Sequence, residues 1–276
     1  IKSVIEIDGD YFLLTSNKNL NCYYAALVRL SDNKQLIKSQ CLPDKENIDF
    51  AGLGGGYVSI GDSVLLAIGT PAHESEIINN LAQNSNSIFG KIIKIKKSDL
   101  VNSSLEKVDY EIYTSGHRNP QGMTIINDTV YSIEHGPHGG DELNLILPGN
   151  NYGWPKHSYG IPYDFKNKYS HLDKTRKKVN ALFTFLPAVA PSSLSNCPKN
   201  LSIYYKNNTC LMGLSLKAMS IIIILLDIEN NNVISVEKIP METRLRHFGF
   251  NSKMKLHEDN DKSFYITTDN FEVLKI

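Results

Sequence analysis

The fold is decided by a short unit of sequence that reads NDTVYSI, at residues 127–133. Its polar start is typical of a turn, and the β-branched and aromatic residues that follow are typical of a strand. Four other stretches repeat this design: DGDYFLLT at 8–15, GDSVLLAI at 61–68, NNTCLMG at 207–213 and DKSFYITT at 261–268. Further strand candidates follow these units, among them residues 25–30, 90–95, 221–228 and 271–276.

The spacing of these units favours one all-β architecture. Successive units start 53, 66, 80 and 54 residues apart. Repeats of about 40–50 residues with several strands each predict the blades of a β-propeller, and the longer spacings leave room for insertions between blades. A β-sandwich with irregular loops is the alternative. Helical periodicity is confined to one short candidate, at residues 74–82, which is consistent with either all-β fold.

Composition and charge limit the partners that the chain can have. Of its 276 residues, 41% are hydrophobic and 21% are charged, which is usual for a globular protein. Basic and acidic residues number 29 each, so the chain has no electrostatic footprint for nucleic acid. The longest apolar run, around residues 221–226, is too short to span a bilayer. We expect a single domain over residues 1–276, no nucleic-acid partner and no membrane span.

Four cysteines carry information about the compartment. None of them forms a C-x-x-C pair, so zinc and thioredoxin-like sites are not indicated. Cys22 and Cys41 flank one strand-turn-strand pattern, and Cys197 and Cys210 flank another. Two local disulfides and an oxidising compartment are therefore one interpretation, and four buried thiols are the other. We predict in particular that Cys197 and Cys210 are bridged.

Gly, Pro and polar residues cluster on either side of the central unit. GHRNPQG precedes it at 116–122, EHGPHGGDELN follows it at 134–144, and PGNNYGWP comes next at 148–155. Such clusters form functional loops on a rigid scaffold. Asp141, Glu142 and neighbouring backbone carbonyls suit Ca²⁺, and Arg118 can hold a carboxylate with two hydrogen bonds. The stretch predicts a site for a hard cation and an anionic ligand, unless it is a connector with solvated charges.

These rare strings resemble the soluble PQQ-dependent sugar dehydrogenases, the glucose/sorbosone dehydrogenase-like family. The resemblance implies a six-bladed β-propeller that oxidises an aldose sugar or another alcohol by hydride transfer to PQQ held by Ca²⁺. It also implies an external electron acceptor and a periplasmic or secreted location. Since only five units are present, we expect that the N-terminal blade is absent from this chain and that the natural protein extends further in that direction.

The resemblance also implies site residues. The carbonyls of Gly136 and Pro137 would hold the Ca²⁺ of the cofactor, and Glu142 and Tyr152 match positions that bind a second, structural Ca²⁺. Ala188 stands where a cofactor-binding Thr is often found. The segment around Lys217 is similar to the S-L-K segment of the family, and the segment around Leu245 is similar to R-x-R. The implied cofactor contacts are Arg118, Asn119, Tyr163, Ser215, Leu216, Lys217, Arg244, Leu245 and Arg246.

One departure from the family pattern concerns catalysis. In the segment similar to H-x-G-G-R, the catalytic His aligns with Leu53 and the Arg with Tyr57. Without a general base, hydride transfer should slow by about 10²–10⁴-fold. His73 is nearby in sequence and could substitute, whereas His117 and His135 are interpreted as structural residues or as supports for neighbouring site residues. The alternatives to an enzyme of this family are a degenerate propeller that binds Ca²⁺ and anions, and a lactonase-type hydrolase.

Overall fold

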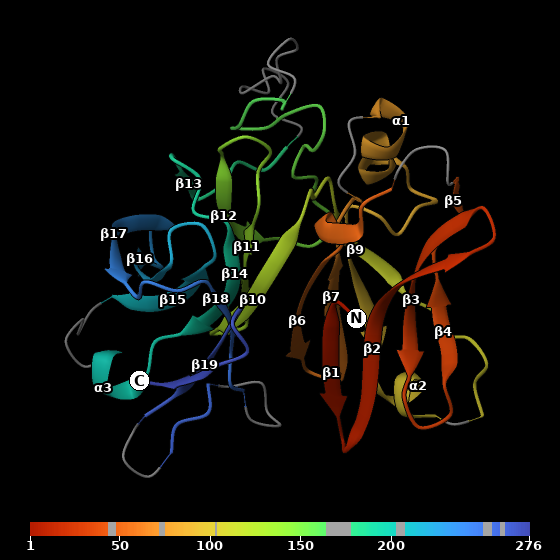
Figure 1. Cartoon of the computed structure of the whole chain (residues 1–276), viewed down its shortest axis with the longest axis horizontal. Coiled ribbons are helices and arrows are strands. Elements are labelled where there is room, and N and C mark those ends of the chain that lie inside the picture. Colours follow the sequence, from red (N-terminus) through yellow and green to blue (C-terminus); the bar gives the residue numbers. More distant parts are fainter. Residues whose placement is uncertain are drawn as a thin grey trace. The chain divides into compact units, whose positions relative to one another are not determined.

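Strands dominate the computed structural model, which describes residues 1–43, 48–71, 75–102, 104–163, 178–202, 208–250, 256–259 and 263–276. They form five antiparallel sheets of consecutive strands (Figure 1). The chain divides into two compact units. The first comprises Ile1–Pro120, Leu147–Ser158 and Tyr169–Val179, and the second comprises Gln121–Ile146, Tyr159–Lys168 and Asn180–Ile276.

The first unit holds two sheets. Sheet one consists of β1 (Ser3–Ile7), β2 (Asp10–Asn19), β3 (Cys22–Arg29), β4 (Lys34–Lys38) and the short β5 (Leu42–Pro43), which pairs with β3. Sheet two consists of β6 (Gly54–Ile60), β7 (Ser63–Ile68), β8 (Lys91–Lys96) and β9 (Glu111–Ser115). Short helices lie between strands: the 3₁₀ turn η2 (Phe50–Gly52), α1 (Glu76–Asn79), the 3₁₀ turn η3 (Asn80–Gln83) and α2 (Lys97–Val101).

The second unit holds three sheets. Sheet three consists of β10 (Pro120–Ile126), β11 (Thr129–Glu134), β12 (Asp141–Ile146) and β13 (Phe183–Phe185). Sheet four consists of β14 (Pro191–Asn196), β15 (Thr209–Ser215), β16 (Ser220–Asp227) and β17 (Asn232–Pro240). Sheet five consists of β18 (Leu245–Phe248), β19 (Tyr265–Thr268) and β20 (Val273–Lys275). The short helix α3 (Lys199–Ser202) lies between β14 and β15.

The recurring unit of the sequence has one fixed place in this topology. Its five copies supply β2, β7, β11, β15 and β19, which are the second strands of the five sheets. The strand candidates that follow four of the units supply β3, β8, β16 and β20. Consecutive antiparallel sheets of this kind are propeller blades. The predicted all-β propeller fold is therefore confirmed, with five sheets in the described residues where the family fold has six. The short helix expected at 74–82 is also present, as α1 and η3.

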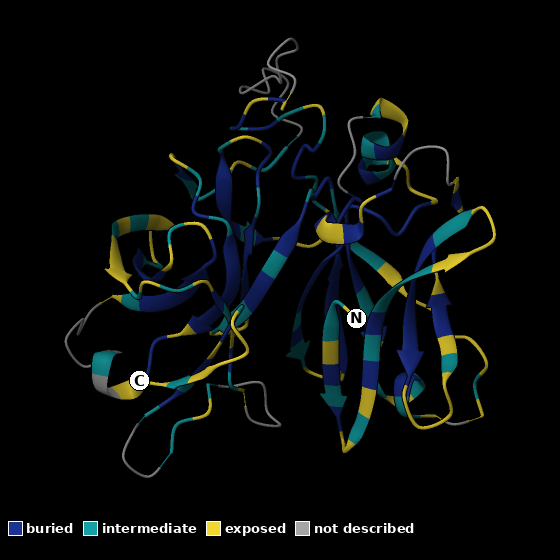
Figure 2. Cartoon of the chain, in the orientation of Figure 1, coloured by how far each residue is buried: buried dark blue, intermediate teal, exposed yellow. Residues whose placement is uncertain are grey.

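Sheet four shows why the apolar run at 221–226 has no polar interruption. Along β16, Ile221, Ile223 and Leu225 belong to one core with side chains of sheet five. The residues between them, Ile222, Ile224 and Leu226, belong to another core with side chains of sheet three. Because side chains alternate between the faces of a strand, a sheet buried on both faces needs apolar residues at every position. Figure 2 shows this strand in the buried class.

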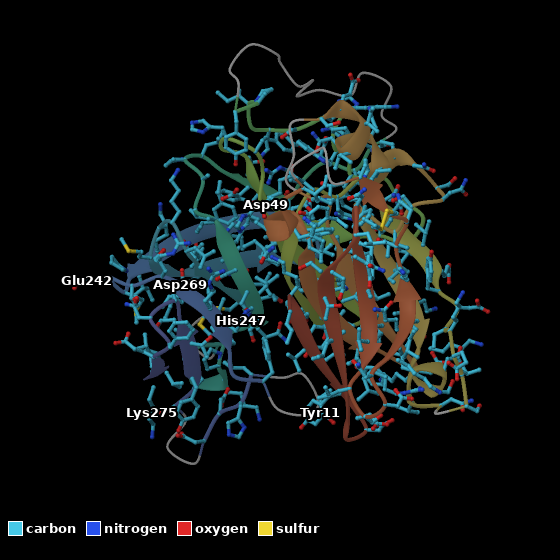
Figure 3. The ribbon with its side chains drawn as sticks, turned by 45° about the vertical axis from the view of Figure 1, so that its right-hand side comes forward. Tyr11, Asp49, Glu242, His247, Asp269 and Lys275 are labelled. Carbon is cyan, nitrogen blue, oxygen red and sulfur yellow. A yellow bond between two sulfur atoms is a disulfide. The ribbon has the colours of Figure 1, made fainter. Side chains whose placement is uncertain are left out.

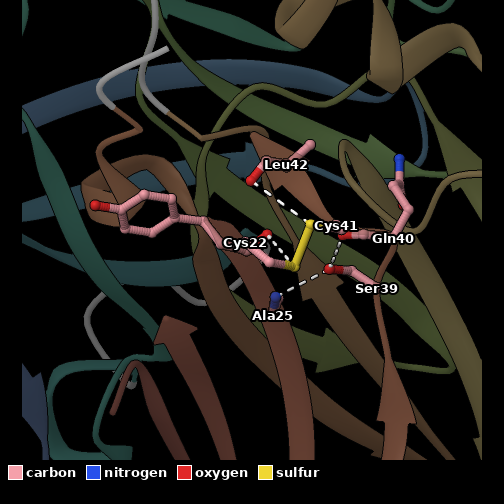
Figure 4. The surroundings of a disulfide bond; sticks show 7 residues. Cys22, Ala25, Ser39, Gln40, Cys41 and Leu42 are labelled. Carbon is pink, nitrogen blue, oxygen red and sulfur yellow. Dashed lines mark hydrogen bonds between the residues drawn. A yellow bond between two sulfur atoms is a disulfide. The ribbon is translucent and has the colours of Figure 1, made fainter. Parts of the chain in front are cut away.

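Both pairs of cysteines form disulfides, as predicted. Cys22 is bonded to Cys41, and Cys197 is bonded to Cys210. The first disulfide lies beside Ser39, whose hydroxyl accepts a hydrogen bond from Ala25 N at 2.9 Å (Figure 4). The four cysteines are therefore not buried thiols, and the disulfide interpretation is confirmed.

Among the described residues, no helix is both long and apolar enough to cross a membrane.

Candidate functional site

In the first unit, the start of the GHRNPQG stretch is held against the NYGWP loop by close backbone contact. Gly116 has a φ of +77°, and a Cβ atom on it would lie 2.2 Å from the Asn151 side chain. Its carbonyl accepts a hydrogen bond from Trp154 N at 2.9 Å. Only glycine combines this left-handed conformation with so close an approach. The two loops that carry the sequence resemblance therefore form one rigid structure.

Arg118 and Asn119 project from this structure in different surroundings. The Arg118 guanidinium carbon lies 5.4 Å from the ring centre of Trp154, a cation–π contact that fixes the side chain. Asn119 is buried, and its side-chain oxygen accepts a hydrogen bond from Gly54 N at 3.1 Å. Arg118 is thus partly exposed, while Asn119 ties the loop to the start of β6.

His117 is structural, as the sequence predicted. It is fully buried, its Nε2 lies 2.9 Å from the Thr114 hydroxyl, and its ring stacks on Tyr152 with centroids 4.6 Å apart. The Tyr152 hydroxyl accepts a hydrogen bond from Leu147 N at 2.9 Å. Since the side chain of Tyr152 supports the loop in this way, a metal-binding role for this residue would fall to its backbone carbonyl.

Lys91 supports the same region and was missed at the sequence level. It is 1% exposed, and its ammonium group donates to the carbonyls of Leu81, Ala82 and Phe89 at 3.0, 2.8 and 3.0 Å. Burial lowers the pKa of Lys91 to about 8, so the group is still protonated at neutral pH. Ala82 O also accepts Gly116 N at 3.2 Å, which connects this lysine to the GHR loop.

In the second unit, the loop with Gly136 and Pro137 is folded tightly on itself. A Cβ atom on Gly136 would lie 2.3 and 2.4 Å from the carbonyl oxygens of Gly139 and Gly140. The Tyr163 hydroxyl donates to Pro137 O at 3.2 Å. Carbonyl oxygens therefore gather around Gly136, which is the donor chemistry that Ca²⁺ prefers. Tyr163, which is exposed, contacts the predicted metal-binding segment directly.

Asp141, which the sequence pattern offered as a Ca²⁺ ligand, has another role. Its Oδ1 accepts Gly136 N at 2.9 Å, and its Oδ2 accepts Val189 N and Ala190 N at 2.8 and 2.7 Å. The side chain is 2% exposed. Three backbone donors satisfy this carboxylate, so it organises the loop.

Glu142 lies in a buried polar cluster that no single-strand pattern reveals. It is paired across the sheet with Glu134, and Asn144 is paired with Ser132 in the same way. The Asn144 amide donates to Glu142 at 3.0 Å and to Glu134 at 3.4 Å. The buried side-chain oxygens of Asn144 and Ser132 have no hydrogen-bond partner among the described residues. Two carboxylates and two unsatisfied oxygens on one face of β11 and β12 suit a hard cation.

Among the described residues, no three His, Cys, Asp or Glu side chains group together as a metal site. The predicted ligands at Gly136 and Pro137 are backbone carbonyls, which such a grouping does not include.

The segment from Ser215 to Lys217 is anchored by its backbone. Ser215 is fully buried and donates its hydroxyl to Val189 O at 2.6 Å. Leu216 N and Lys217 N donate to Ala190 O and Val189 O at 2.9 and 3.0 Å. Leu216 is buried, whereas the Lys217 side chain is exposed. The anchor therefore leaves the ammonium group of Lys217 accessible to an anionic ligand.

Arg244 and Arg246 share one carboxylate, which the sequence analysis did not identify. The Nε atoms of both arginines donate to Asp269, at 2.6 Å from Arg244, and Arg246 Nη2 donates to it at 3.2 Å. Asp269 is labelled in Figure 3. These hydrogen bonds lower the pKa of Asp269, with Arg246 as the larger cause. Each guanidinium has five N–H groups, so both can bind a further anion while Asp269 orients them.

Leu245 and His135 both belong to backbone anchors. Leu245, which separates the two arginines in sequence, is fully buried, and its carbonyl accepts the Ser192 hydroxyl at 2.7 Å. His135 Nε2 lies 2.6 Å from Pro191 O, in agreement with the predicted structural role. Leu245 can thus contribute to a site through its backbone position, and its side chain belongs to the core.

The position aligned with the catalytic His points into the first unit's core. Leu53 is 0% exposed and packs in the hydrophobic cluster of that unit. Tyr57 donates its hydroxyl to Val4 O at 2.9 Å, and burial is the main cause that raises its pKa to about 12. Neither side chain is a general base. His73 lies outside the described residues.

Comparison with known proteins gives a consistent result. A family profile described as Glucose / Sorbosone dehydrogenase matches residues 11–273. An uncharacterised protein of Synechocystis sp. is 38% identical over 147 residues, which are 50% of this chain and 34% of that protein. Quinoprotein glucose dehydrogenase B of Acinetobacter calcoaceticus is 42% identical over 71 residues, which are 24% of this chain and 15% of that enzyme.

A solved structure of a glucose dehydrogenase has a similar fold. It aligns with a TM-score of 0.73 and 21% identity, and covers 99% of this chain and 80% of that chain. At this identity the likeness concerns the fold. The chain therefore spans about a third of the Synechocystis protein and 15% of glucose dehydrogenase B.

Proposed function

Because the chain belongs to the glucose/sorbosone dehydrogenase family, we propose that it is a PQQ-dependent oxidoreductase acting on an aldose sugar or another alcohol. The observation that carries this proposal is the set of cationic residues at the positions of the family motifs. Arg118 is fixed on Trp154, Lys217 is exposed, and Arg244 and Arg246 are oriented by Asp269. Such residues suit PQQ, which is a tricarboxylate.

The proposed roles follow from the surroundings of each residue. Arg118, Lys217, Arg244 and Arg246 would bind the carboxylates of the cofactor, with Asn119 as a further polar contact. Tyr163 would pack its ring against the flat quinone. Ser215, Leu216 and Leu245 would place these groups through their buried backbone anchors.

Ca²⁺ would take two places in this proposal. The carbonyls of Gly136 and Pro137 would hold one ion beside the cofactor. The buried oxygens of Glu142 and its neighbours on β11 and β12 would hold a second, structural ion. When bound, PQQ supplies a hydride acceptor, and Ca²⁺ supplies a Lewis acid that polarises it.

The test is a titration of the purified chain with PQQ in the presence of Ca²⁺, followed by quinone absorbance, and then the addition of a panel of aldoses. Ca²⁺-dependent binding with sugar-driven bleaching would support the enzyme. Absence of binding by folded protein would refute it. Turnover of lactones without any quinone would instead favour a hydrolase.

A second candidate function rests on the position of Leu53. Because this side chain is buried in the core, the described residues place no base at the aligned position. A propeller that binds Ca²⁺ and an anionic ligand without turnover would retain every cation described above. Tight binding of PQQ without reduction by any sugar would identify this alternative.

Location and partners are part of the same proposal. The two disulfides fit an oxidising compartment, so we place the protein in the periplasm or outside the cell. A sugar dehydrogenase also needs an external electron acceptor. Fractionation of the source cells and assays with artificial acceptors would test these two points separately.

A further inference from the structure

Asp141 stands at the junction of two segments that are far apart in sequence. Its Oδ1 accepts the N–H of Gly136, next to the predicted metal-binding carbonyls. Its Oδ2 accepts the N–H groups of Val189 and Ala190, 48 and 49 residues further along the chain. All of these residues belong to the second unit. One buried carboxylate therefore fixes the distance between the two segments.

The second segment in turn holds the predicted cofactor-binding lysine. Val189 O accepts the Ser215 hydroxyl at 2.6 Å and Lys217 N at 3.0 Å. Ala190 O accepts Leu216 N at 2.9 Å. A continuous series of short hydrogen bonds thus runs from Gly136 through Asp141 to Lys217.

The backbone at Val189 and Ala190 is shaped for an anion. Ala190 has a φ of +53°, which is uncommon for a residue other than glycine. Successive N–H groups in such a turn converge into a concave site that binds an anion. Here the anion is the carboxylate of Asp141, which accepts hydrogen bonds from Val189 N and Ala190 N within the protein itself.

The chemistry requires a carboxylate at this position. An ionised Asp is an acceptor only, with two oxygens for three N–H donors. An Asn of the same shape would turn an N–H₂ group toward Gly136 N or toward the pair at Val189 and Ala190. At least one hydrogen bond would then become a contact between two donors.

We propose that Asp141 is a positioning residue that sets the Gly136–Pro137 carbonyls and Lys217 in one geometry for the bound ligand. This inference rests on the proposed function for the identity of that ligand. The sequence pattern offered Asp141 as a metal ligand, whereas the structure assigns it to the support of two ligand-binding segments.

The first experiment needs no ligand. Amide hydrogen exchange of Gly136, Val189 and Ala190 is measured by NMR in the whole chain and in Asp141→Asn. We expect exchange to accelerate by about tenfold or more at Gly136 or at the Val189–Ala190 pair, whichever then faces the amide nitrogen of the Asn side chain. Asp227→Asn is the matched control, because the hydrogen bonds that the described residues give the Asp227 carboxylate come from Glu229 and Asn230 in its own turn. Unchanged exchange in Asp141→Asn would overturn the inference.

The second experiment uses PQQ with Ca²⁺ as the probe. Loss of a residue that orients metal ligands typically weakens binding by about 10–100-fold, and we expect this for Asp141→Asn. We also expect the absorbance maximum of the bound quinone to move from its wild-type value. A variant that is only less stable would bind less quinone with an unchanged spectrum, and that result would refute positioning.

Ser215→Ala provides a milder variant in case Asp141→Asn does not fold. It removes the hydroxyl that donates to Val189 O and accepts Ala218 N at 2.9 Å. The same spectral shift, with a smaller loss of affinity, is expected, and an unchanged spectrum and affinity would count against the proposal. If the wild-type chain binds no PQQ, the proposed function fails, while the exchange experiment still decides whether Asp141 couples the two segments.

Discussion

Replacement of Lys91 by Met should destabilise the protein strongly, although no surface contact is lost. The buried ammonium group donates to three backbone carbonyls, of Leu81, Ala82 and Phe89. Leu81 O and Ala82 O keep a backbone donor, from Asn84 N and Gly116 N. Phe89 O would lose the donor that the structure gives it.

The magnitude follows from these three carbonyls. A buried acceptor left unsatisfied costs about 1–3 kcal/mol, which applies fully to Phe89 O. The two other carbonyls each lose one of two donors, for about 0.5–1 kcal/mol apiece. Relief of the desolvated charge offsets part of the sum. We therefore expect the free energy of unfolding to fall by about 2–4 kcal/mol.

Urea unfolding, followed by tryptophan fluorescence, measures this loss. The midpoint should fall while the slope stays constant, because the folded structure is kept. Lys96→Met is the matched control, since Lys96 lies on the same strand but is exposed and should change stability by less than about 0.5 kcal/mol. A loss for Lys91→Met no larger than that of the control would refute the structural role.

The pH dependence gives an independent check on Lys91. Its pKa is lowered by burial from 10.5 to about 8, so between these values the unfolded chain holds the proton and the folded chain releases it. Stability therefore rises with pH in this window relative to a chain without the lysine. The free energy of unfolding of wild type should therefore rise relative to that of Lys91→Met from pH 8 to pH 10. A difference in stability that stays constant over this range would contradict the buried position of Lys91.

Three further predictions concern single side chains. Gly140→Ala should lower the free energy of unfolding in urea by about 3 kcal/mol or more, because φ is +69° and the new Cβ would lie 2.2 Å from Gly160 N. Gly149→Ala is the control and should cost about 1 kcal/mol, since its φ is also positive but its Cβ would meet open space. The arginines lower the pKa of Asp269, so the stability that this carboxylate contributes is present above its ordinary pKa of 3.8 and is lost as pH falls. The free energies of unfolding of wild type and Asp269→Asn should therefore converge in acid. At neutral pH they should differ by less than about 1 kcal/mol, because the ion pairs are partly exposed. Leu53→His should lower the free energy of unfolding by about 2–4 kcal/mol, because it buries a polar ring in the core, and should produce no sugar-driven quinone reduction. A variant that gains turnover with full stability would show instead that this position reaches the substrate.

The fold was predictable because its signal is local. Each copy of the turn-strand unit carries its own turn residues and its own strand pattern, and all five became second strands of sheets. The run at 221–226 read as a buried strand for the same reason. The division into two compact units was not predictable, because it depends on which sheets pack together rather than on any one strand.

The site was predictable only where a side chain is recognisable by its neighbours in sequence. Arg118, Lys217 and the arginine pair were proposed from short strings, and their role in binding stays a prediction. The role of Asp141 was assigned wrongly and that of Asp269 was missed, because Val189 lies 48 residues from Asp141 and the two arginines lie 25 and 23 residues from Asp269. A carboxylate within a Gly-rich loop looks the same whether it faces a metal ion or three backbone N–H groups.

The same distinction separates the two halves of the proposed function. In the proposed function, binding of the cofactor would depend on cations and carbonyls that have internal supports: Trp154 for Arg118, Asp141 for Gly136 and Asp269 for the arginines. None of these supports involves Leu53. A chain that has lost the base can therefore keep the binding site intact, and PQQ binding alone will not distinguish an enzyme from a binding protein. Only reduction of the bound quinone by a sugar addresses catalysis, because the proton must go to a group that the binding site does not need.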